Sequence, residues 1–388
     1  MKICLVGPCS PHDISYELFE FQSDNYAQVK FYRGIPVSTL ANELLAAGHE
    51  VEIISTAFNL EEQQIILNGP RLKFTIVRST KNTKVRVLTF WRNERKLLTK
   101  AIEKSDADVF HAHWTYEFAM ATLNCRRDAL ITAHDAPFKI FEHYRDFHRF
   151  LRLLMAIFVR FRTRNLVVVS PYLADSWRKN MQWKKSIIHL PNLTPTGFIR
   201  ANTVYSPDGN RVLCVSDASE LKNVKTLIRS WNQVPHLSND SLLVLVGNDL
   251  GLGEEMFQWA DSRGLNNRIE WKGYLERQDV SSEMCRANRL CHPSLEESHS
   301  LVLVEALALG LPIVAGKNSG AVAWTIGPAG ILVDVESESD ISDAILHLLQ
   351  NSDVRVGLSN MAVKRSLEVF GTQKILANYL ETYRLLAG

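Results

Sequence analysis

Two glutamates stand eight positions apart around the start of a predicted helix, Glu297 just before it and Glu305 within it. Ser298 and Ser300 are suitable N-caps for this helix. The free N–H groups and the positive dipole end of a helix N-terminus bind phosphate. Carboxylates repel phosphate, but they accept hydrogen bonds from sugar hydroxyls. The pattern therefore predicts a ligand with an anionic middle and hydroxylated ends.

The helix is indicated by apolar residues at helical spacing, which are Val302, Leu303, Ala306, Leu307 and Leu309. Pro293 precedes the segment, and Gly310 and Pro312 follow it, so residues that interrupt helices mark both ends. The apolar run 313–315 comes next and predicts a parallel strand.

Short buried strands alternate with helical segments along the whole chain. They are predicted at 3–6, 51–55, 109–111, 130–132, 166–169 and 187–190, and again at 212–215, 242–246, 269–271, 290–292, 313–315 and 331–333. The stretch 194–210 between the two series is rich in Pro, Gly, Asn and Ser and predicts a linker. Two series of βα units predict an α/β protein with two Rossmann-like domains, at 1–195 and 206–368. Because parallel sheets bind ligands at the carboxyl ends of their strands, a ligand is expected between the domains.

Charge is unevenly distributed although the net charge is only +2. Residues 1–195 carry 27 Lys and Arg against 19 Asp and Glu, a balance of +8, whereas residues 196–388 carry 17 against 23, a balance of −6. The basic half is therefore expected to face an anionic partner. No nucleic-acid-binding module accompanies the charge, so an anionic lipid surface or a phosphate-bearing acceptor is favoured over nucleic acid.

The six cysteines form no C-x-x-C pair, which favours reduced thiols over a disulfide framework. The first apolar run is too short for a signal peptide, and no apolar stretch reaches the roughly 18 residues of a membrane span. The protein is expected to be cytoplasmic.

Two short patterns resemble metal sites. His111 and His113 share one face of a predicted strand, but no third ligand accompanies them. Asp106 and Asp108 match a literal D-x-D, yet they precede a buried strand, where charged residues are common. We expect no bound metal and no cofactor.

The segment PSLEES-x2-LVLVEALALGLPIVA resembles the donor-binding motif of the retaining family-4 glycosyltransferases, E-x7-E. In that family the first glutamate contacts the transferred sugar and the second contacts the ribose of the nucleotide. The resemblance assigns these roles to Glu297 and Glu305. It also implies that the residues at the helix mouth bind the donor, namely Ser298, His299, Ser300 and Leu301.

The resemblance covers nearly the whole chain and implies the GT-B fold, with two Rossmann-like domains facing a central cleft. The stretch from residue 33 resembles the family's glycine-rich loop, but only Gly34 is present, and Arg33 occupies the position of the other glycine. The segment 132–135 resembles the T-x-H segment whose histidine, here His134, reaches the transferred sugar. Residues 370–388 resemble the terminal helix that packs back on the first domain.

In the second domain the resemblance implies that Lys222 binds the donor diphosphate, and that the loop at Tyr274 and Leu275 reads the base. Asp217 stands where the family carries an arginine. The missing positive charge is expected from Arg33, although a changed donor or a loss of activity would also follow from this substitution.

The implied function is metal-independent, retaining transfer of a sugar from a UDP- or GDP-sugar to a hydroxyl of a glycan or lipid-linked acceptor, in cell-surface polysaccharide or lipopolysaccharide biosynthesis. Lys222 and the helix N-terminus would stabilise the leaving diphosphate, and His134 and Glu297 would orient the sugar. Two alternatives stay open: a nucleotide-sugar epimerase or hydrolase of the same fold, and a catalytically silent nucleotide- or glycan-binding relative.

The segment 144–163 predicts a basic amphipathic helix. Drawn as one helix, Arg145, Arg149, Arg152 and Arg160 share a narrow face, and the phenylalanines gather opposite. Such a helix can lie on an anionic membrane, such as the inner face of the plasma membrane. The alternative is that its apolar face packs on the first domain.

Overall fold

Parallel strands whose two faces are both buried form the core of each half of the chain. The computed structural model describes residues 1–19, 21, 26, 28–125, 128–194, 209–234 and 241–388, so most of the predicted linker lies outside the described residues. The chain divides into a first unit, Met1–Leu193 with Thr372–Gly388, and a second unit, Thr194–Gly371. No described helix is both long and apolar enough to cross a bilayer.

The first unit contains one sheet of nine described strands. Its order is β4-β5-β3-β1-β6-β7-β8-β9, with β2 paired antiparallel to β3. The strands are β1 Lys2–Val6, β2 Lys30–Phe31, β3 Glu50–Phe58, β4 Gln64–Gly69, β5 Leu72–Arg78, β6 Val109–His113, β7 Ala129–Ala133, β8 Asn165–Val168 and β9 Ile187–His189. In β1, four consecutive residues are fully buried, because an inner parallel strand is covered on both faces.

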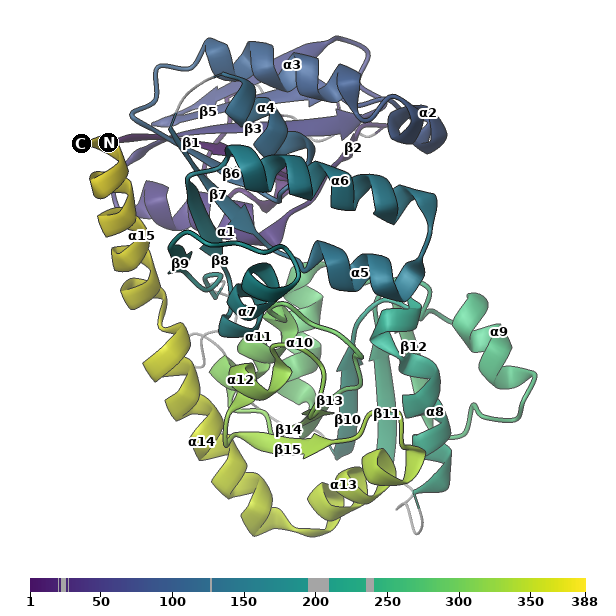
Figure 1. The fold of residues 1–388 in the computed structure, drawn as a ribbon. Helices are drawn as coiled ribbons and strands as arrows, with labels where there is room; N and C mark the ends of the chain where they lie inside the picture. Colours follow the sequence, from purple (N-terminus) through teal and green to yellow (C-terminus); the bar gives the residue numbers. More distant parts are fainter. Residues whose placement is uncertain (20, 22–25, 27, 126–127, 195–208, 235–240) are drawn as a thin grey trace. The chain divides into compact units, whose positions relative to one another are not determined.

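Helices connect these strands and pack on the sheet (Figure 1). They are α1 Ile35–Ala46, α2 Thr83–Leu88, α3 Arg92–Glu103, α4 Glu117–Asn124, α5 Pro137–Tyr144, α6 Phe147–Arg162, α7 Pro171–Lys179 and the terminal α15 Thr372–Ala387. The hydroxyl of Tyr383 in α15 lies 2.8 Å from Nδ1 of His111 in β6, so the end of the chain is tied to the centre of this sheet.

The second unit contains a fully parallel sheet of six described strands in the order β12-β11-β10-β13-β14-β15. The strands are β10 Asn210–Val215, β11 Ser241–Val246, β12 Ile269–Gly273, β13 Arg289–His292, β14 Ile313–Gly316 and β15 Gly330–Val333. The helices are α8 Val224–Gln233, α9 Glu255–Asp261, α10 Arg277–Arg286, α11 Leu301–Leu309, α12 Val322–Ile326, α13 Glu338–Gln350 and α14 Ser352–Phe370.

The prediction of two Rossmann-like domains with parallel sheets is confirmed, and each predicted strand has its counterpart. The sequence did not predict β2, β4 and β5. The β4–β5 hairpin turns at Pro70 and Arg71, with Arg71 in the left-handed region, and it extends the edge of the sheet by antiparallel pairing.

In the second unit the strand order reverses direction between β10 and β13, which are adjacent in the sheet although three α-helices, the 3₁₀ helix Glu220–Lys222 and two strands separate them in sequence. In open α/β sheets, such a reversal at the carboxyl edge is where ligands bind, because the loops after the two strands lead to opposite sides of the sheet. The loop after β10 contains Asp217 and Lys222, and the loop after β13 contains Glu297. Topology alone therefore brings these residues to the position where sheets of this type bind ligands.

The loop after β10 passes very close to the end of β11. A Cβ built on Gly247 would lie 1.5 Å from the carbonyl oxygen of Ser216, and φ of Gly247 is +140°. This φ is accessible essentially to glycine alone.

We expect Gly247→Ala to destabilise the protein and to displace the loop at Ser216. Gly253→Ala is the matched control, because φ of Gly253 is also positive but no atom lies within 4 Å of the Cβ that alanine would add there. Overpacking costs about 1–3 kcal/mol, so urea denaturation should show Gly247→Ala to be the less stable variant by about that amount. Equal stability of the two variants would contradict a close approach.

Candidate functional site

The best-defined cluster of the second unit is centred on the carboxylate of Glu297. Its Oε1 lies 2.6 Å from Nζ of Lys222 and 3.0 Å from Nε2 of His292. Burial by itself would raise the pKa of Glu297, but the Lys222 ammonium and the hydrogen bond from His292 outweigh burial, so the pKa lies well below its ordinary value. The carboxylate is therefore ionised at every physiological pH and can only accept hydrogen bonds.

The partners of Glu297 are fixed by the same contact. Burial lowers the pKa of Lys222, but Glu297 raises it by more, so the lysine stays charged. Because an ionised carboxylate is acceptor-only, Nε2 of His292 must carry the hydrogen of their bond. One Lys222 donor is used by Glu297, which leaves further N–H groups of the ammonium for a ligand.

Backbone hydrogen bonds hold the surrounding loops together. The Leu295 N–H donates to the Leu221 carbonyl (2.8 Å), and the Ala321 N–H donates to the Glu297 carbonyl (2.7 Å). Asn223 adds a side-chain link, because its amide donates to the carbonyls of Pro293 and Val335. The pairing of Lys222 with Glu297 thus rests on a backbone that is fixed on both sides.

Asp217 has a role within its own loop. Its Oδ1 accepts a hydrogen bond from the Ser219 N–H at 2.8 Å, and its carbonyl accepts one from the Ser216 hydroxyl at 2.8 Å. The carboxylate therefore stabilises the turn that leads to Lys222, and it also contributes to the raised pKa of Lys222.

Helix α11 begins as predicted. Ser300 is its N-cap and accepts a hydrogen bond from the Leu303 N–H, and Gly310 ends the helix at φ +77°. Ser298 lies in the loop just before the cap, and Leu301 is the first helical residue.

Glu305 is buried within α11 and is bound by Arg277, the first residue of α10. Burial raises the pKa of Glu305, and the Arg277 guanidinium lowers it by less, so the pKa remains above its ordinary value. The Arg277 guanidinium thus offsets part of the effect of burial and favours the ionised form of Glu305, which accepts hydrogen bonds from hydroxyl groups.

The other predicted donor residues differ in exposure. Tyr274 is exposed and its hydroxyl donates to Glu276, while Leu275 is half-buried beside it. His299 is buried, and its ring lies 5.7 Å from that of Phe370 and 6.0 Å from that of Trp324.

His134, Arg33 and Gly34 belong to the first unit, whereas the other predicted site residues belong to the second. His134 follows β7, and its Nε2 lies 2.9 Å from Nδ1 of His113 at the end of β6. Its ring also packs 4.4 Å from that of Trp114. Burial lowers the pKa of His113 well below its ordinary value, so this neighbour of His134 is neutral.

Next to His134, the carboxylate of Asp135 accepts a hydrogen bond from the Tyr116 hydroxyl at 2.8 Å. Burial raises the pKa of Asp135 to about 6. The guanidinium of Arg152 lies over the Tyr116 ring (4.6 Å) and 3.8 Å from Glu117. At the carboxyl edge of this sheet, Asp135 therefore changes its charge near pH 6. The buried Arg152, which is paired with Glu117, stands beside it.

Gly34 is the N-cap of α1, and a Cβ there would lie 2.2 Å from the Pro8 carbonyl oxygen. The backbone of Gly34 therefore passes too close to Pro8 to leave room for a side chain. Arg33 pairs with Asp13 at 3.5 Å and is partly exposed.

The two patterns that resembled metal sites are engaged in structural contacts. His111 uses both ring nitrogens, with Tyr383 and with the Thr132 hydroxyl at 2.6 Å. Asp106 and Asp108 both bind Lys2, one at its ammonium and one at its backbone N–H. In the part of the chain that the structure describes, no group of three or more His, Cys, Asp or Glu side chains is arranged to hold a metal ion.

Sequence comparison gives two adjacent matches that together span residues 37–365. Residues 197–365 match the family described as Glycosyl transferases group 1, and residues 37–196 match Glycosyltransferase Family 4. The chain belongs to the family-4 glycosyltransferases. The predicted family and the GT-B fold are thereby confirmed.

Individual relatives agree with the family and fold. The D-inositol 3-phosphate glycosyltransferase of Paenarthrobacter aurescens is 28% identical over 183 residues, 46% of this chain and 44% of the relative. The sucrose-phosphate synthase structure from Thermosynechococcus elongatus has a TM-score of 0.78 at 19% identity, covering 100% of this chain and 99% of that one. HepE from Anabaena, solved with UDP and glucose, has a TM-score of 0.66 at 17% identity and covers 99% of each chain.

The matched stretches span less than half the length of the curated relatives found by sequence. The sequence analysis missed three residues of this candidate site: His292, Asn223 and Arg277. His292 had a signal, because it ends a predicted strand five residues before Glu297. Arg277 and Asn223 gave none, since their partners lie far away in the sequence.

We expect Arg277→Met to destabilise the protein more at pH 8 than at pH 5. Without the guanidinium, the pKa of Glu305 in the folded protein rises further above its value in the unfolded chain. The folded state is then stabilised below the unfolded-state pKa, and this stabilisation is lost as the pH rises through the folded-state pKa. Arg277 is about one-third exposed, so we expect a loss of only about 1–3 kcal/mol at pH 8, after discounting for solvent screening.

Urea denaturation at the two pH values measures this difference. Arg277→Lys is the matched control, because it keeps a cation beside Glu305. An equal loss of stability at both pH values would show that Arg277 acts only by packing.

Proposed function

We propose that this family-4 protein transfers a sugar from a nucleotide-sugar to an acceptor hydroxyl with retention of anomeric configuration. The observation that carries the proposal is the ionised Glu297, paired with Lys222 and His292 beside the N-terminus of α11. An acceptor-only carboxylate, an ammonium with donors to spare and a helix N-terminus match a sugar linked to a diphosphate.

Each part of the donor then has a partner. Lys222 and the first turn of α11, with Ser298, Ser300 and Leu301, stabilise the charge of the leaving diphosphate. Glu297 accepts hydrogen bonds from the sugar and Glu305 from the ribose, while Tyr274 and Leu275 contact the base. His134 helps to orient the sugar, and Gly34 and Arg33 contribute to phosphate or acceptor binding.

The reaction breaks the bond between the anomeric carbon and the phosphate oxygen and forms one to the acceptor oxygen on the same face. The acceptor proton passes to the leaving phosphate, so the atoms and charges of the reaction balance without a metal or cofactor. Lys222 favours this path because it neutralises the charge that develops on the diphosphate.

We propose a UDP-sugar as the first donor to test, with a GDP-sugar as the alternative. The acceptor is a glycan or lipid-linked hydroxyl in cell-surface polysaccharide or lipopolysaccharide biosynthesis, at the cytoplasmic side of an anionic membrane. The basic balance of residues 1–195 supports an anionic acceptor or surface. A phosphate-bearing acceptor fits the same charge, and the relative named for D-inositol 3-phosphate makes it worth including.

A silent nucleotide- or glycan-binding relative is the second candidate, favoured by one observation: Asp217 stands in place of the family's arginine. Incubation with labelled nucleotide-sugars and analysis of the products separates the cases. A glycosylated acceptor supports transfer, an isomerised sugar or free sugar indicates an epimerase or hydrolase, and bound but unchanged donor indicates the silent relative.

We expect Glu305→Ala and Lys222→Ala to weaken nucleotide-sugar binding by about 1–3 kcal/mol, the scale of a hydrogen bond to a charged group. Glu297→Gln should lower turnover more than nucleotide affinity, because Glu297 is proposed to contact the sugar. Calorimetric titration and a steady-state assay measure the two quantities. Lys364→Ala, which removes an exposed cation of α14, is the control.

Unchanged nucleotide affinity in both Glu305→Ala and Lys222→Ala, with circular dichroism showing an intact fold, would rule out this donor site. A thermal-shift comparison of UDP-, GDP- and ADP-sugars identifies the base, because a ligand that binds the folded state raises its apparent stability.

We expect Asp217→Asn to have a mild effect on activity and Arg33→Ala a severe one. The side-chain amide introduced by Asp217→Asn still offers an oxygen to the Ser219 N–H, so the turn is kept and only the charge is lost. Arg33 is proposed to supply the positive charge that position 217 lacks. If Asp217→Arg instead creates strong nucleotide-sugar binding in a protein that otherwise has none, the silent-relative proposal is correct.

A further inference from the structure

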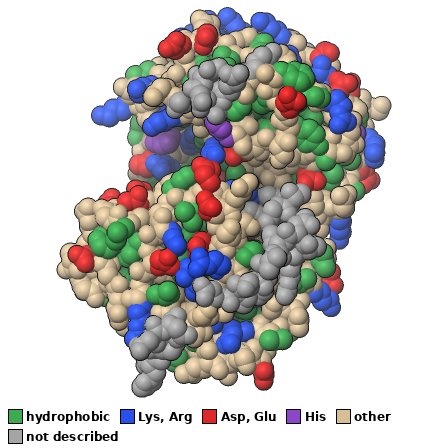
Figure 2. Space-filling view, turned by 180° about the vertical axis from the view of Figure 1, so that it is seen from behind, with side chains coloured by type: hydrophobic (Ala, Val, Ile, Leu, Met, Phe, Trp, Pro, Cys, Tyr) green, Lys and Arg blue, Asp and Glu red, His purple; other side chains and the backbone are tan. Residues whose placement is uncertain are grey.

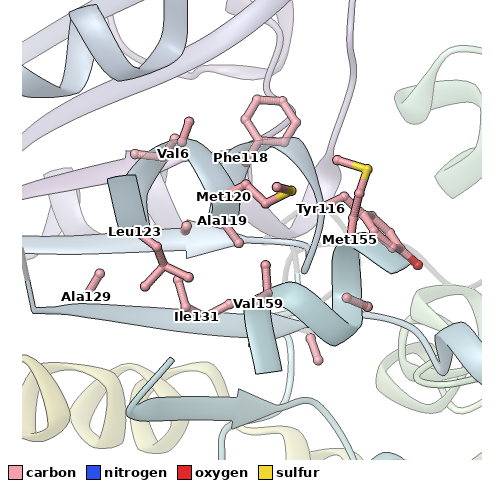
Figure 3. Packing of buried hydrophobic residues seen from close by; sticks show 14 of the residues in the cluster. Val6, Tyr116, Phe118, Ala119, Met120, Leu123, Ala129, Ile131, Met155 and Val159 are labelled. Carbon is pink, nitrogen blue, oxygen red and sulfur yellow. The ribbon is translucent and has the colours of Figure 1, made fainter. Parts of the chain in front are cut away.

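Helix α6 is apolar on two sides, and only one of them is buried. Leu153, Met155, Ala156 and Val159 are buried against the first unit's core. Figure 3 shows Met155 and Val159 among side chains of the same cluster from α4 and β7. This side packs α6 on the first unit.

The second side is a stripe of exposed residues, which we name the phenylalanine stripe: Phe147, Phe150, Leu154, Phe158 and Phe161. Their relative exposure ranges from 38% to 71%. The spacing of three, four, four and three residues places them along one line of the helix. A continuous apolar line at the surface indicates an interaction site.

Exposed phenylalanines are concentrated in this region. Of the six among the described residues, five lie on α5 or α6, namely Phe138, Phe147, Phe150, Phe158 and Phe161. Figure 2 shows one face of the molecule, on which described side chains of both charges are interspersed and hydrophobic ones form small separate groups.

Arginines border the stripe. The Arg160 guanidinium lies 4.5 Å from the centre of the Phe161 ring, and that of Arg162 lies 5.3 Å from the Phe158 ring. Arg164, just beyond the helix, is 79% exposed. The segment 137–164 carries seven Lys and Arg but only two Asp and Glu, and α6 itself carries no acidic residue.

The predicted arrangement of the arginines was wrong, and the difference matters here. The helix is broken at Arg145, which is the C-cap of α5 in the left-handed region. Arg152 turns to the inside, between Glu117 and the rings of Tyr116 and Trp91. The guanidiniums that lie over exposed phenylalanine rings are those of Arg160 and Arg162 at the end of α6, and the apolar stripe itself faces solvent.

We propose that the phenylalanine stripe of α6 docks on an anionic lipid surface, with Arg160, Arg162 and Arg164 at the headgroups. The rings of Phe158 and Phe161, each under a guanidinium, fit the boundary between acyl chains and phosphates, where one layer is apolar and the next is anionic. The excess of positive charge favours an anionic surface over a neutral one. The proposal identifies the surface by which this protein, in the proposed function, contacts the membrane. It rests on the proposed function only in that the acceptor is taken to be lipid-linked.

Co-sedimentation of the full chain with vesicles tests the proposal. We expect at least tenfold stronger partitioning to phosphatidylcholine vesicles with about 30% phosphatidylglycerol than to pure phosphatidylcholine, an estimate from the roughly 1 kcal/mol contributed by each basic residue near an anionic surface. The variant Phe147→Ser/Phe158→Ser/Phe161→Ser should lose this binding, and Arg162→Gln/Arg164→Gln should lose the preference for anionic vesicles.

The control is Leu88→Ser/Leu252→Ser/Leu367→Ser, which removes three exposed apolar residues from other helices and loops. It should bind vesicles as the wild type does. Equal binding of the wild type to neutral and anionic vesicles, or full binding by the stripe variant, would overturn the proposal. A dimer without lipid that the stripe variant abolishes would show that the stripe binds a second copy instead.

The two proposals fail in different ways. A thermal shift of the stripe variant on addition of a nucleotide-sugar would show that the variant is folded. It would also show that nucleotide-sugar binding does not depend on the stripe. Vesicle binding without any sugar transfer would contradict the proposed function and leave the docking surface intact. Sugar transfer to a soluble acceptor without vesicle binding would support the proposed function and contradict the docking surface.

Discussion

The buried carboxylate of Glu297 is the constraint on which the candidate site depends. A carboxylate in this position stays ionised only because Lys222 and His292 are both bound to it. The lysine comes from a loop 75 residues earlier in the chain, so the contact requires the loops after β10 and β13 to be held together. The bond from the Leu295 N–H to the Leu221 carbonyl and the bond from the Asn223 amide to the Pro293 carbonyl meet this requirement. The chemistry of the site is therefore inseparable from the strand order of the sheet.

Two further ionic contacts follow the same logic, in which a buried charge is balanced by one from another element. Arg277 supports Glu305 from the start of α10, and Arg152 stands near Glu117 and Asp135 in the first unit. Asp217 differs, since its carboxylate is used by the adjacent backbone N–H of Ser219. Asp217 in place of the family's arginine is thus compatible with an ordered loop. Its effect on phosphate binding depends on its negative charge and not on the order of the loop.

Helix α6 illustrates how an amphipathic pattern can be interpreted in two ways. Its sequence contains enough apolar residues for two faces, and periodicity does not say which of them meets the core. Packing against α4 and β7 uses Leu153, Met155, Ala156 and Val159, so the larger phenylalanines remain outside. The inward turn of Arg152 toward Glu117 was equally invisible in the sequence.

The sequence by itself determined the two series of βα units, the cap and end of α11, the family and the motif of Glu297 and Glu305. These features depend on local periodicity, on capping residues and on short spacings, all of which act between neighbours in the chain. The partners His292, Asn223 and Arg277, and the exposed stripe of α6, were decided only by the tertiary structure. The paths of distant loops determine which charges meet, and the packing of one helix face determines which side chains stay in solvent. Local spacing in the sequence encodes neither of these.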